Sequence, residues 1–322
     1  MIAVVGAGGT IGGKVCEFLD AWGVPSSRRD FRLEGDEHVD ARDPSSLERA
    51  LAGASVCVNC ADYRLNLEVM DGALRAGCHY VDLGGLFHVT RRQLELDARF
   101  RDAGLTAVLG MGSAPGKTNL LAGAAVARLG EDPAALEIWA ATRDPAAAGH
   151  PFPITYSAQT LLDELTMRPV VLRDGELTEV EPLSGSAERE VPELGRVEGM
   201  YTLHSELATL PETFPTLRDA SFRLSLSPGL VDKLLALGDE RPEPYAQSER
   251  SVAVHLVDVD GVTGVAITRG GSARSTAEPP ARAAVELAEG RIANPGVHPP
   301  ETAVDDPEGF LGMLDTEVRW GG

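Results

Sequence analysis

A group of closely spaced glycines near the start of the chain carries the clearest chemical signal in the sequence. These glycines are Gly6, Gly8, Gly9 and Gly12. They follow an apolar run at residues 2–5 and precede a segment with helical spacing, the order that a dinucleotide site needs. Glycine lets the backbone approach a pyrophosphate closely, and the N-terminus of the helix predicted at residues 14–22 offers free N–H groups. Thr10 and Ile11, which lie among the glycines, are also predicted to bind the cofactor. We predict nucleotide binding; a purely structural turn is the alternative, because the spacing departs from the strict G-x-G-x-x-G.

Acidic residues after the next predicted strand bear on the choice of cofactor. In many such sites a carboxylate about 20 residues beyond the glycines accepts hydrogen bonds from the adenosine ribose. Counting from Gly12 leads to Glu34 and Asp36. Because carboxylates repel a 2′-phosphate, these residues favour NAD. Three arginines between positions 28 and 32 keep NADP as an alternative.

A histidine flanked by polar residues is the strongest candidate for proton transfer. Within residues 198–206, His204 lies between Tyr201 and Glu206. An imidazole titrates near neutral pH, which suits the removal of a proton from an amine or its delivery to an imine. We predict that His204 is the acid/base and that Glu206 or Tyr201 orients it or binds a substrate ammonium. A structural, hydrogen-bonding histidine is the alternative.

Three further side chains are candidates for substrate contacts. Lys117 is predicted to bind a carboxylate or relay a proton, with simple exposure at a helix start as the alternative. Tyr156 follows a proline-containing loop and is expected to line the pocket. His88 follows a pair of glycines and is a candidate for the cleft, with lower priority. No metal site is predicted, because the histidines are dispersed along the chain.

The composition is that of an acidic globular protein. The chain has 322 residues, 43% of them hydrophobic, and a formal net charge of −20. This charge argues against nucleic acid and anionic membranes as partners, since both are bound through basic patches. No apolar run reaches the roughly 18–20 residues of a spanning helix, and we expect no signal peptide and a cytoplasmic location. Cys57 and Cys60 have C-x-x-C spacing, but their setting is typical of a buried strand.

Strands and helices alternate over the first third of the chain. Strands are expected at residues 2–5, 29–33, 38–40, 54–60, 80–83 and 106–109. This alternation predicts a Rossmann-type parallel sheet, in which ligands bind at the carboxyl ends of the strands.

Longer strands follow a predicted helix at residues 120–129. They are expected at residues 136–142, 170–173, 197–203, 221–226 and 251–269, the last as a hairpin, with further helices at 281–289 and 310–317. The sequence therefore predicts an α/β protein with a second, α+β domain on a mixed, largely antiparallel sheet. We expect a dinucleotide-binding domain at 1–120, a substrate-binding and dimerisation domain at 121–280, and C-terminal helices at 281–322 that return to the first domain.

Several segments together point to a known family. They are residues 4–12, Asn59, residues 76–85 with the run Y-V-D-L-G-G, residues 112–119 with A-P-G-K-T-N, and residues 296–301. Together they resemble the saccharopine dehydrogenase-like oxidoreductases, and most closely the lysine 6-dehydrogenase-type members. The likeness runs nearly end to end but is weak in the middle of the chain.

The resemblance implies a nicotinamide cofactor and the oxidation of an amine to an imine, or the reverse reduction. By position, the residues bordering the cofactor would be Asn59, Cys60, Ala61, Asp82, Gly84, Gly85 and Met111. Thr118 and Asn119, next to Lys117, would lie towards the domain cleft and bind substrate. Lys117 departs from the apolar residue of many relatives, which indicates a different substrate.

These observations lead to one functional hypothesis with two alternatives. We predict an NAD(P)-dependent oxidoreductase, with NAD preferred, that acts on a C–N bond of a small amino-acid-derived substrate. One alternative is the reductive condensation of an amine with an oxo acid, as in saccharopine-type relatives. The other is a nucleotide-binding regulatory protein without turnover. By analogy with the family, we expect a homodimer.

Overall fold

The computed structural model describes residues 1–150, 152–154, 156–226, 229–238, 240, 242 and 245–321. The chain divides into two compact units, Met1–Gly116 with Thr276–Asp305, and Lys117–Ser275 with Asp306–Gly322. Within the described residues, no helix combines the length and the apolar character needed to cross a membrane.

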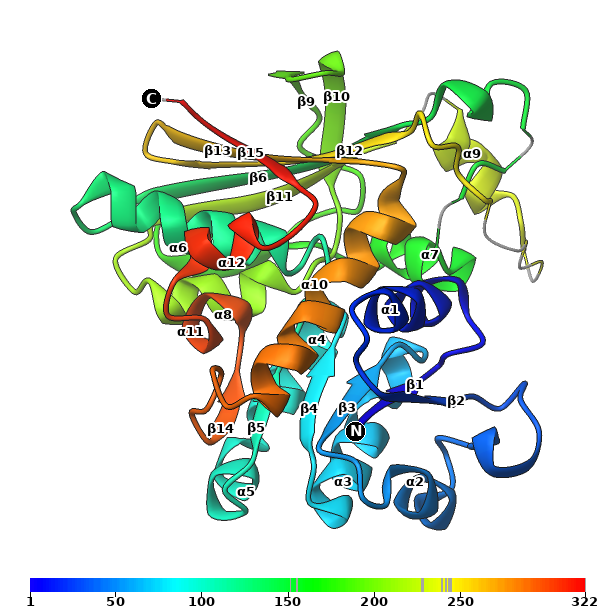
Figure 1. Cartoon of the computed structure of the whole chain (residues 1–322). Helices are drawn as coiled ribbons and strands as arrows, with labels where there is room; N and C mark the ends of the chain where they lie inside the picture. The colour runs from blue at the N-terminus through cyan, green and yellow to red at the C-terminus, as the bar shows by residue number, and fades with distance from the viewer. Residues whose placement is uncertain are drawn as a thin grey trace. The chain divides into compact units, whose positions relative to one another are not determined.

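The first unit is built on a six-stranded sheet with the strand order β14-β5-β4-β3-β1-β2 (Figure 1). Its strands are β1 (Ile2–Val5), β2 (Ser26–Arg29), β3 (Val56–Asn59), β4 (His79–Asp82), β5 (Thr106–Val108) and β14 (Gly296–His298). Every neighbouring pair is parallel. Strands β1 and β3 are buried along their whole length, which explains why they appear in the sequence as continuous apolar runs. The predicted Rossmann-type sheet is confirmed.

Two of the predicted strands differ from the structure. β2 ends at Arg29 and does not reach Leu33, and the expected strand at 38–40 is reduced to a single bridge between Asp30 and His38. Phe31, which lies within the predicted strand, instead exposes 64% of its surface in a loop. The sixth strand is instead β14, which comes from the far end of the sequence.

Helices cover both faces of this sheet. They are α1 (Thr10–Ala21), α2 (Pro44–Leu51), α3 (Asn66–Ala76), α4 (Leu86–Leu94), α5 (Asp97–Asp102), α11 (Pro300–Ala303) and the part of α10 (Ser272–Ala288) that begins at Thr276. Residues of α2, α3 and α5 pack with Tyr80 in one core, while the guanidinium of Arg282 on α10 lies 4.3 Å from the ring centre of Trp22, just after α1.

A buried carboxylate ties together the carboxyl ends of neighbouring strands. Asp82 ends β4 and is fully buried. Its Oδ1 accepts hydrogen bonds from the backbone N–H groups of Gly84 at 3.0 Å and Gly110 at 2.7 Å. Its Oδ2 accepts from the hydroxyl of Tyr80 at 2.9 Å and the side-chain amide of Gln93 at 2.6 Å. Because Gly110 follows β5, one side chain holds the turns after both β4 and β5.

Two asparagines extend this network to β3. The side-chain amide of Asn66 donates to Oδ2 of Asp82 at 3.2 Å, and its Oδ1 accepts from Nδ2 of Asn59 at 2.9 Å. Asn59 ends β3, and its Oδ1 accepts from the backbone N–H of Ala61 at 3.1 Å. Burial raises the pKa of Asp82, although the hydrogen bonds around it favour the carboxylate.

The glycine turn between β1 and α1 is packed too closely for side chains. A Cβ atom on Gly12 would lie 2.2 Å from the carbonyl oxygen of Gly6, and one on Gly6 would lie 2.6 Å from the carbonyl carbon of Cys60. Gly6 also has a φ of +83°, a conformation that other residues rarely adopt. By contrast, a Cβ on Gly13 would meet its nearest neighbour at an ordinary 3.7 Å.

The second unit is built on a nine-stranded sheet that follows the path β15-β13-β12-β6-β11-β10-β9, with β7 paired to β11 and β8 paired to β7. Its strands are β6 (Ala135–Arg143), β7 (Val170–Arg173), β8 (Glu176–Glu179), β9 (Ala187–Val191), β10 (Gly195–Tyr201), β11 (Asp219–Ser225), β12 (Val252–Val259), β13 (Val262–Arg269) and β15 (Glu317–Gly321). Strands β6 and β11 are parallel, and the other pairs are antiparallel. The predicted mixed, largely antiparallel sheet is confirmed.

The helix predicted at 310–317 is shorter in the structure, and a strand follows it. The helix α12 (Pro307–Gly312) stops early, and β15 pairs with β13. Trp320 of β15 packs onto Gly264 of β13, where a Cβ would lie 2.7 Å from its ring. This pairing between distant segments favours the strand over the local helical pattern.

The two faces of the second sheet have different coverings. Helices α6 (Lys117–Leu129), α8 (Glu206–Thr213) and α12 lie along one face (Figure 1). On the other face, Val191 and Leu194 of the β9–β10 hairpin pack with Trp139 and Leu256. The remaining helices, α7 (Ala158–Thr166) and α9 (Leu230–Leu235), form a separate apolar cluster with each other.

We expect Gly12→Ala to lower the free energy of unfolding by about 1–3 kcal/mol, because the added methyl group overlaps the carbonyl of Gly6. Gly13→Ala is the matched control: it lies in the same helix with room for a methyl group and is expected to leave stability unchanged or raise it by about 0.5–1 kcal/mol. Urea unfolding of both variants measures the difference, and equal stability would contradict the packing argument.

We expect Asp82→Asn to lower the free energy of unfolding by about 2–4 kcal/mol. In either orientation the amide would turn an NH₂ group towards donors that now meet a carboxylate oxygen, which leaves buried groups unsatisfied. The exposed Asp102 provides the control, Asp102→Asn. A loss below about 1 kcal/mol in chemical denaturation would show that the network contributes little to stability.

Candidate functional site

The N-terminus of α1 offers an anion site in the first unit. Its N-cap, Gly9, makes no side-chain capping bond, and the first turn of the helix has no acidic residue. Thr10 and Ile11 open the helix directly after the turn, so their N–H groups lie at the positive end of the helix dipole. Close backbone packing and an uncapped helix start are the features that fit a dinucleotide pyrophosphate.

An acidic residue missed by the sequence analysis lies beside this turn. Asp30 directly follows β2 and is 3% exposed; its Oδ2 accepts from the backbone N–H of Gly8 at 2.9 Å, and its Oδ1 from that of Arg32 at 2.8 Å. The residues proposed from the sequence, Glu34 and Asp36, lie farther along an exposed loop and short 3-10 turn. The difference arises because β2 ends earlier than expected; an earlier strand end would have pointed to Asp30.

The residues after β3 also border the glycine turn. The backbone N–H of Cys60 bonds to the carbonyl of Val5 at 2.8 Å, and the backbone of Cys60 and Ala61 packs against Gly6. Burial raises the pKa of the Cys60 thiol, so this cysteine is a thiol rather than a nucleophilic thiolate. Asn59 is buried and serves the network around Asp82.

Of the site residues predicted at and after the end of β4, some are buried and hold the backbone in place, whereas His88 is exposed. Asp82 is buried and bonded on both oxygens, so it positions Gly84. The backbone N–H of the buried Met111 bonds to the carbonyl of Asp82 at 2.8 Å. Gly85 directly precedes α4, and a Cβ there would lie 2.6 Å from Oε1 of Gln93. His88 of α4 is exposed and meets Phe87 edge-on.

A buried cluster of polar side chains occupies the helix-covered face of the second unit. His204 is 7% exposed, and its ring stacks on that of Phe222 with the centres 3.7 Å apart. Its Nε2 lies 3.6 Å from Oε2 of Glu164 on α7, and its Nδ1 lies 3.4 Å from Oε2 of Glu206 at the start of α8. The structure thus brings His204 and Glu206 together, as the sequence analysis expected, and adds Glu164. That glutamate lies forty positions away in the chain and carries no local signal.

The pKa values of the two histidines on this face are shifted in opposite directions by their surroundings. Burial by itself would lower the pKa of His204, but the carboxylates of Glu164 and Glu206 raise it to about 9. Burial, together with the positive charges of Lys117 and His204, lowers the pKa of His255 on β12 to about 3. His204 is therefore the imidazolium and His255 the neutral imidazole at neutral pH.

Two hydroxyl groups hold the carboxylates that flank His204. The hydroxyl of Tyr156 donates to Oε2 of Glu164 at 2.6 Å, and the hydroxyl of Thr118 donates to Oε1 of Glu206 at 2.8 Å. The next predicted substrate contact, Asn119, is also buried and donates to Thr209 of α8 at 3.3 Å. These residues come from four separate segments, so the cluster exists only in the folded unit.

Lys117 is fully buried in the same unit. Its ammonium donates to the hydroxyls of Thr268 at 2.9 Å, Ser275 at 3.1 Å and Thr316 at 2.8 Å. An ammonium has three N–H donors, and each of them has an acceptor here. The contacts connect α6, β13, the start of α10 and the segment before β15, which is a positioning role.

Tyr201 points to the other face of the sheet. It pairs with Arg223 across β10 and β11, and its hydroxyl accepts from that guanidinium at 2.9 Å. Because neighbouring strand residues face opposite sides, Arg223 lies across the sheet from Phe222 and the ring of His204. The structure therefore does not bring Tyr201 to His204, which corrects the predicted orienting role.

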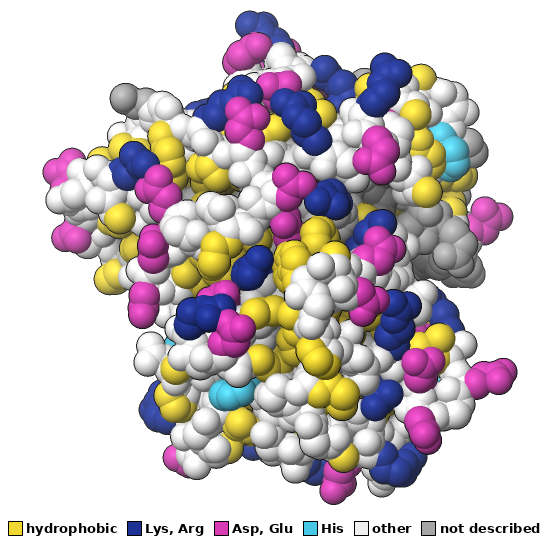
Figure 2. Space-filling view, in the orientation of Figure 1, with side chains coloured by type: hydrophobic (Ala, Val, Ile, Leu, Met, Phe, Trp, Pro, Cys, Tyr) yellow, Lys and Arg dark blue, Asp and Glu magenta, His cyan; other side chains and the backbone are white. Residues whose placement is uncertain are grey.

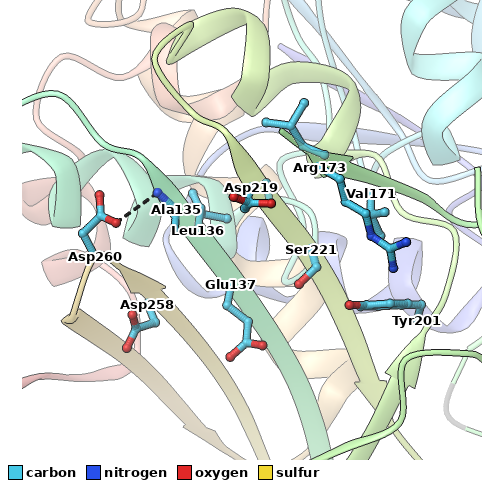
Figure 3. A pocket seen from close by; sticks show the side chains of 12 residues that line it. Ala135, Leu136, Glu137, Val171, Arg173, Tyr201, Asp219, Ser221, Asp258 and Asp260 are labelled. Carbon is cyan, nitrogen blue, oxygen red and sulfur yellow. Dashed lines mark hydrogen bonds between the residues drawn. The ribbon is translucent and has the colours of Figure 1, made fainter. Parts of the chain in front are cut away.

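Tyr201 instead lines a cavity of about 280 Å³ on that opposite face (Figure 3). Two of the acidic residues that line it already have partners. Glu137 pairs with Arg189 and Arg223, and both carboxylate oxygens of Asp260 accept backbone N–H bonds. On the face drawn in Figure 2, acidic and basic side chains are interspersed. Among the described residues, no group of three or more histidine, cysteine and acidic side chains is arranged to hold a metal ion.

Comparison with known proteins agrees with this architecture. A family model described as the saccharopine dehydrogenase NADP binding domain matches residues 32–108. Carboxyaminopropylagmatine dehydrogenase from Synechocystis sp. is 27% identical over 191 residues, which cover 58% of this chain and 48% of that protein. The match thus spans about half the length of this curated relative.

A solved structure is similar over the whole chain. Apo saccharopine dehydrogenase (L-Glu forming) from Saccharomyces cerevisiae matches with a TM-score of 0.69 and 13% identity, covering 100% of this chain and 99% of that one. At this identity the likeness shows the fold. The finer likeness to lysine 6-dehydrogenases stays a prediction. The matches confirm the resemblance inferred from the motifs: the chain is similar to saccharopine dehydrogenases in the sequence of residues 32–108 and in its fold.

Proposed function

We propose that this protein is an NAD(P)-dependent oxidoreductase that acts on a C–N bond of a small amino-acid-derived substrate. The observation that carries the proposal is the glycine turn at the uncapped start of α1, with the buried carboxylate of Asp30 beside it. Both relatives named above are dehydrogenases, and the matching family model describes a cofactor-binding domain.

The cofactor's pyrophosphate would lie against Gly9, Thr10, Ile11 and Gly12. The segment from Asn59 to Ala61 and the turns at Gly84 and Met111 would border it farther along the sheet edge. When bound, the nicotinamide ring donates or accepts a hydride at its C4 atom. The protein's part is to hold the reacting carbon close to that atom and to exclude water.

Asp30 supports a preference for NAD over NADP. It directly follows β2, at the position where dinucleotide sites commonly carry the acidic residue that accepts from a ribose hydroxyl, and a 2′-phosphate near it would meet a buried negative charge. Arg32 is the counterargument, because its guanidinium reaches the carbonyl of Gly8 at 3.3 Å and is available to a phosphate nearby. We assign the preference to Asp30, since it is buried and already bonded to the turn.

His204 is the proposed acid/base, and Glu206 orients it. Thr118 and Tyr156 hold the flanking carboxylates, and Asn119 completes the polar lining. Lys117, with three acceptors around its ammonium, is assigned to positioning rather than to a substrate carboxylate. We also propose a cytoplasmic homodimer, and light scattering on the purified protein measures the subunit number.

The test of the function is a panel of amines and of amine–oxo acid pairs, followed at the absorbance of the reduced nicotinamide with both cofactors. We expect turnover with at least one amine, imine or reductive pairing, which also separates simple dehydrogenation from condensation. We further expect His204→Asn to lose 100-fold or more in kcat, in the range of general acid–base catalysis of about 10²–10⁴. If the protein shows no binding of NADH or NADPH and no turnover with either, the proposal is refuted.

We expect Asp30→Asn to shift cofactor preference from NADH towards NADPH by about tenfold or more, because hydrogen bonds to a charged group contribute about 1.5–3 kcal/mol. Fluorescence titration of both reduced cofactors measures the two Kd values. Asp36→Asn, which removes an exposed carboxylate nearby, is the control and should leave the ratio unchanged. If Asp36→Asn moved the ratio and Asp30→Asn did not, the ribose contact would belong to the loop.

A further inference from the structure

The ring of His204 is held between two carboxylates of the second unit. Oε2 of Glu164 faces Nε2, and Oε2 of Glu206 faces Nδ1. A neutral imidazole carries a hydrogen on only one nitrogen, so it would turn a lone pair towards one of the two carboxylates. Only the imidazolium presents an N–H to both. The geometry therefore selects the protonated ring.

The contacts of His204 with Glu164 and Glu206 are ion pairs rather than short hydrogen bonds. At 3.4 and 3.6 Å, they are longer than the 2.7–2.9 Å typical of charge-assisted bonds. Within the part of the chain that the structure describes, both ring nitrogens and Oε2 of Glu206 are buried without a hydrogen-bond partner. The carboxylates thus stabilise the charge of the ring without forming short hydrogen bonds to its nitrogens.

The other charged and titratable groups around the ring fit the same arrangement. Tyr156 donates its hydroxyl hydrogen to Glu164, and burial together with that carboxylate raises the pKa of the phenol, so it adds no charge. His255 on β12 is kept neutral by its burial and by Lys117 and His204. On β11, the side chain against His204 is the aromatic ring of Phe222.

We propose that Glu164 and Glu206 hold His204 as an imidazolium that protonates the substrate nitrogen, so that at neutral pH the protein is built for imine reduction rather than amine oxidation. This inference rests on the proposed function, because it needs a C–N substrate. Glu164 acts here as a positioning residue, which works through His204.

The proposed step balances in atoms and electrons. A bound reduced nicotinamide would supply the hydride for the imine carbon and become oxidised, and the C=N π electrons would take up the proton of His204 at nitrogen. The products are an amine and a neutral imidazole, which regains its proton from solvent. In the reverse direction the ring must first lose this proton, and the two carboxylates oppose that loss.

The first test measures the charge of His204 without any turnover. NMR of the full chain with ¹⁵N-labelled histidine, assigned with His204→Asn among the seven histidines, follows each ring from pH 5 to 10. We expect His204 to stay protonated through pH 8, and Glu164→Gln and Glu206→Gln each to lower its midpoint by a pH unit or more. The control is Asp163→Asn, whose carboxylate bonds to Gln159 on the same helix.

The second test follows kcat/KM for imine reduction against pH. We expect a plateau up to about pH 8, a fall through about pH 9 as the ring loses its proton, and the opposite trend for amine oxidation. Glu164→Gln should move this fall in kcat/KM to lower pH by the shift seen in NMR. Reduction at pH 8 should then slow about twofold for a shift of one pH unit and about tenfold for a shift of two. Glu164→Asp should restore part of the loss.

The outcomes separate the inference from the proposed function. A neutral His204 at pH 7, or a midpoint that neither glutamine variant moves, overturns the inference even in an active enzyme. A protonated His204 whose titration leaves the reduction limb in place also overturns it, because another group is then the acid. If no amine or imine reacts although the NMR result is as expected, the proposed function fails and the acid role falls with it.

Discussion

The carboxylate of Asp82 is fully buried, and the first unit supplies hydrogen bonds to both of its oxygens. A buried charge is tolerated only where such partners exist, so the ends of β3, β4 and β5 are constrained together with the network that links them. Asn59 and Asn66 carry the constraint across to the residues beside the glycine turn. One buried carboxylate therefore links the strand ends along the edge of the sheet at which a dinucleotide would bind.

In the second unit, buried charges are likewise surrounded by polar or charged partners. Lys117 is buried among hydroxyls that come from three segments, and the ring of His204 is buried between two carboxylates. Both charges lie on the helix-covered face of the sheet. On the opposite face, Glu137 and Asp258, which line the cavity, are paired with Arg189, and Glu137 is also paired with Arg223. The arrangement of the buried charges, rather than the presence of a cavity, therefore favours the face of His204 as the site of chemistry.

The two units suit different parts of the proposed reaction. The glycine turn and Asp30 of the first unit suit the binding of a cofactor that carries a hydride, which is mainly a problem of positioning. The second unit suits the handling of a proton, since His204 and His255 are driven to opposite charge states by their surroundings. A reduction of a C=N bond needs both a hydride and a proton, which is why this pair of units supports the proposed reaction.

The sequence by itself determined the features that depend on local pattern: the glycine turn before α1, the parallel sheet, the mixed second sheet and the resemblance to saccharopine dehydrogenase-like proteins. Tertiary structure decided which side chains meet. Asp30 rather than Glu34 lies at the turn because β2 ends early, and Tyr201 faces away from His204 because strand residues alternate between faces. Glu164 reaches His204 only through the packing of distant segments. Contacts between residues far apart in the chain leave no periodic trace, so only the fold reveals them.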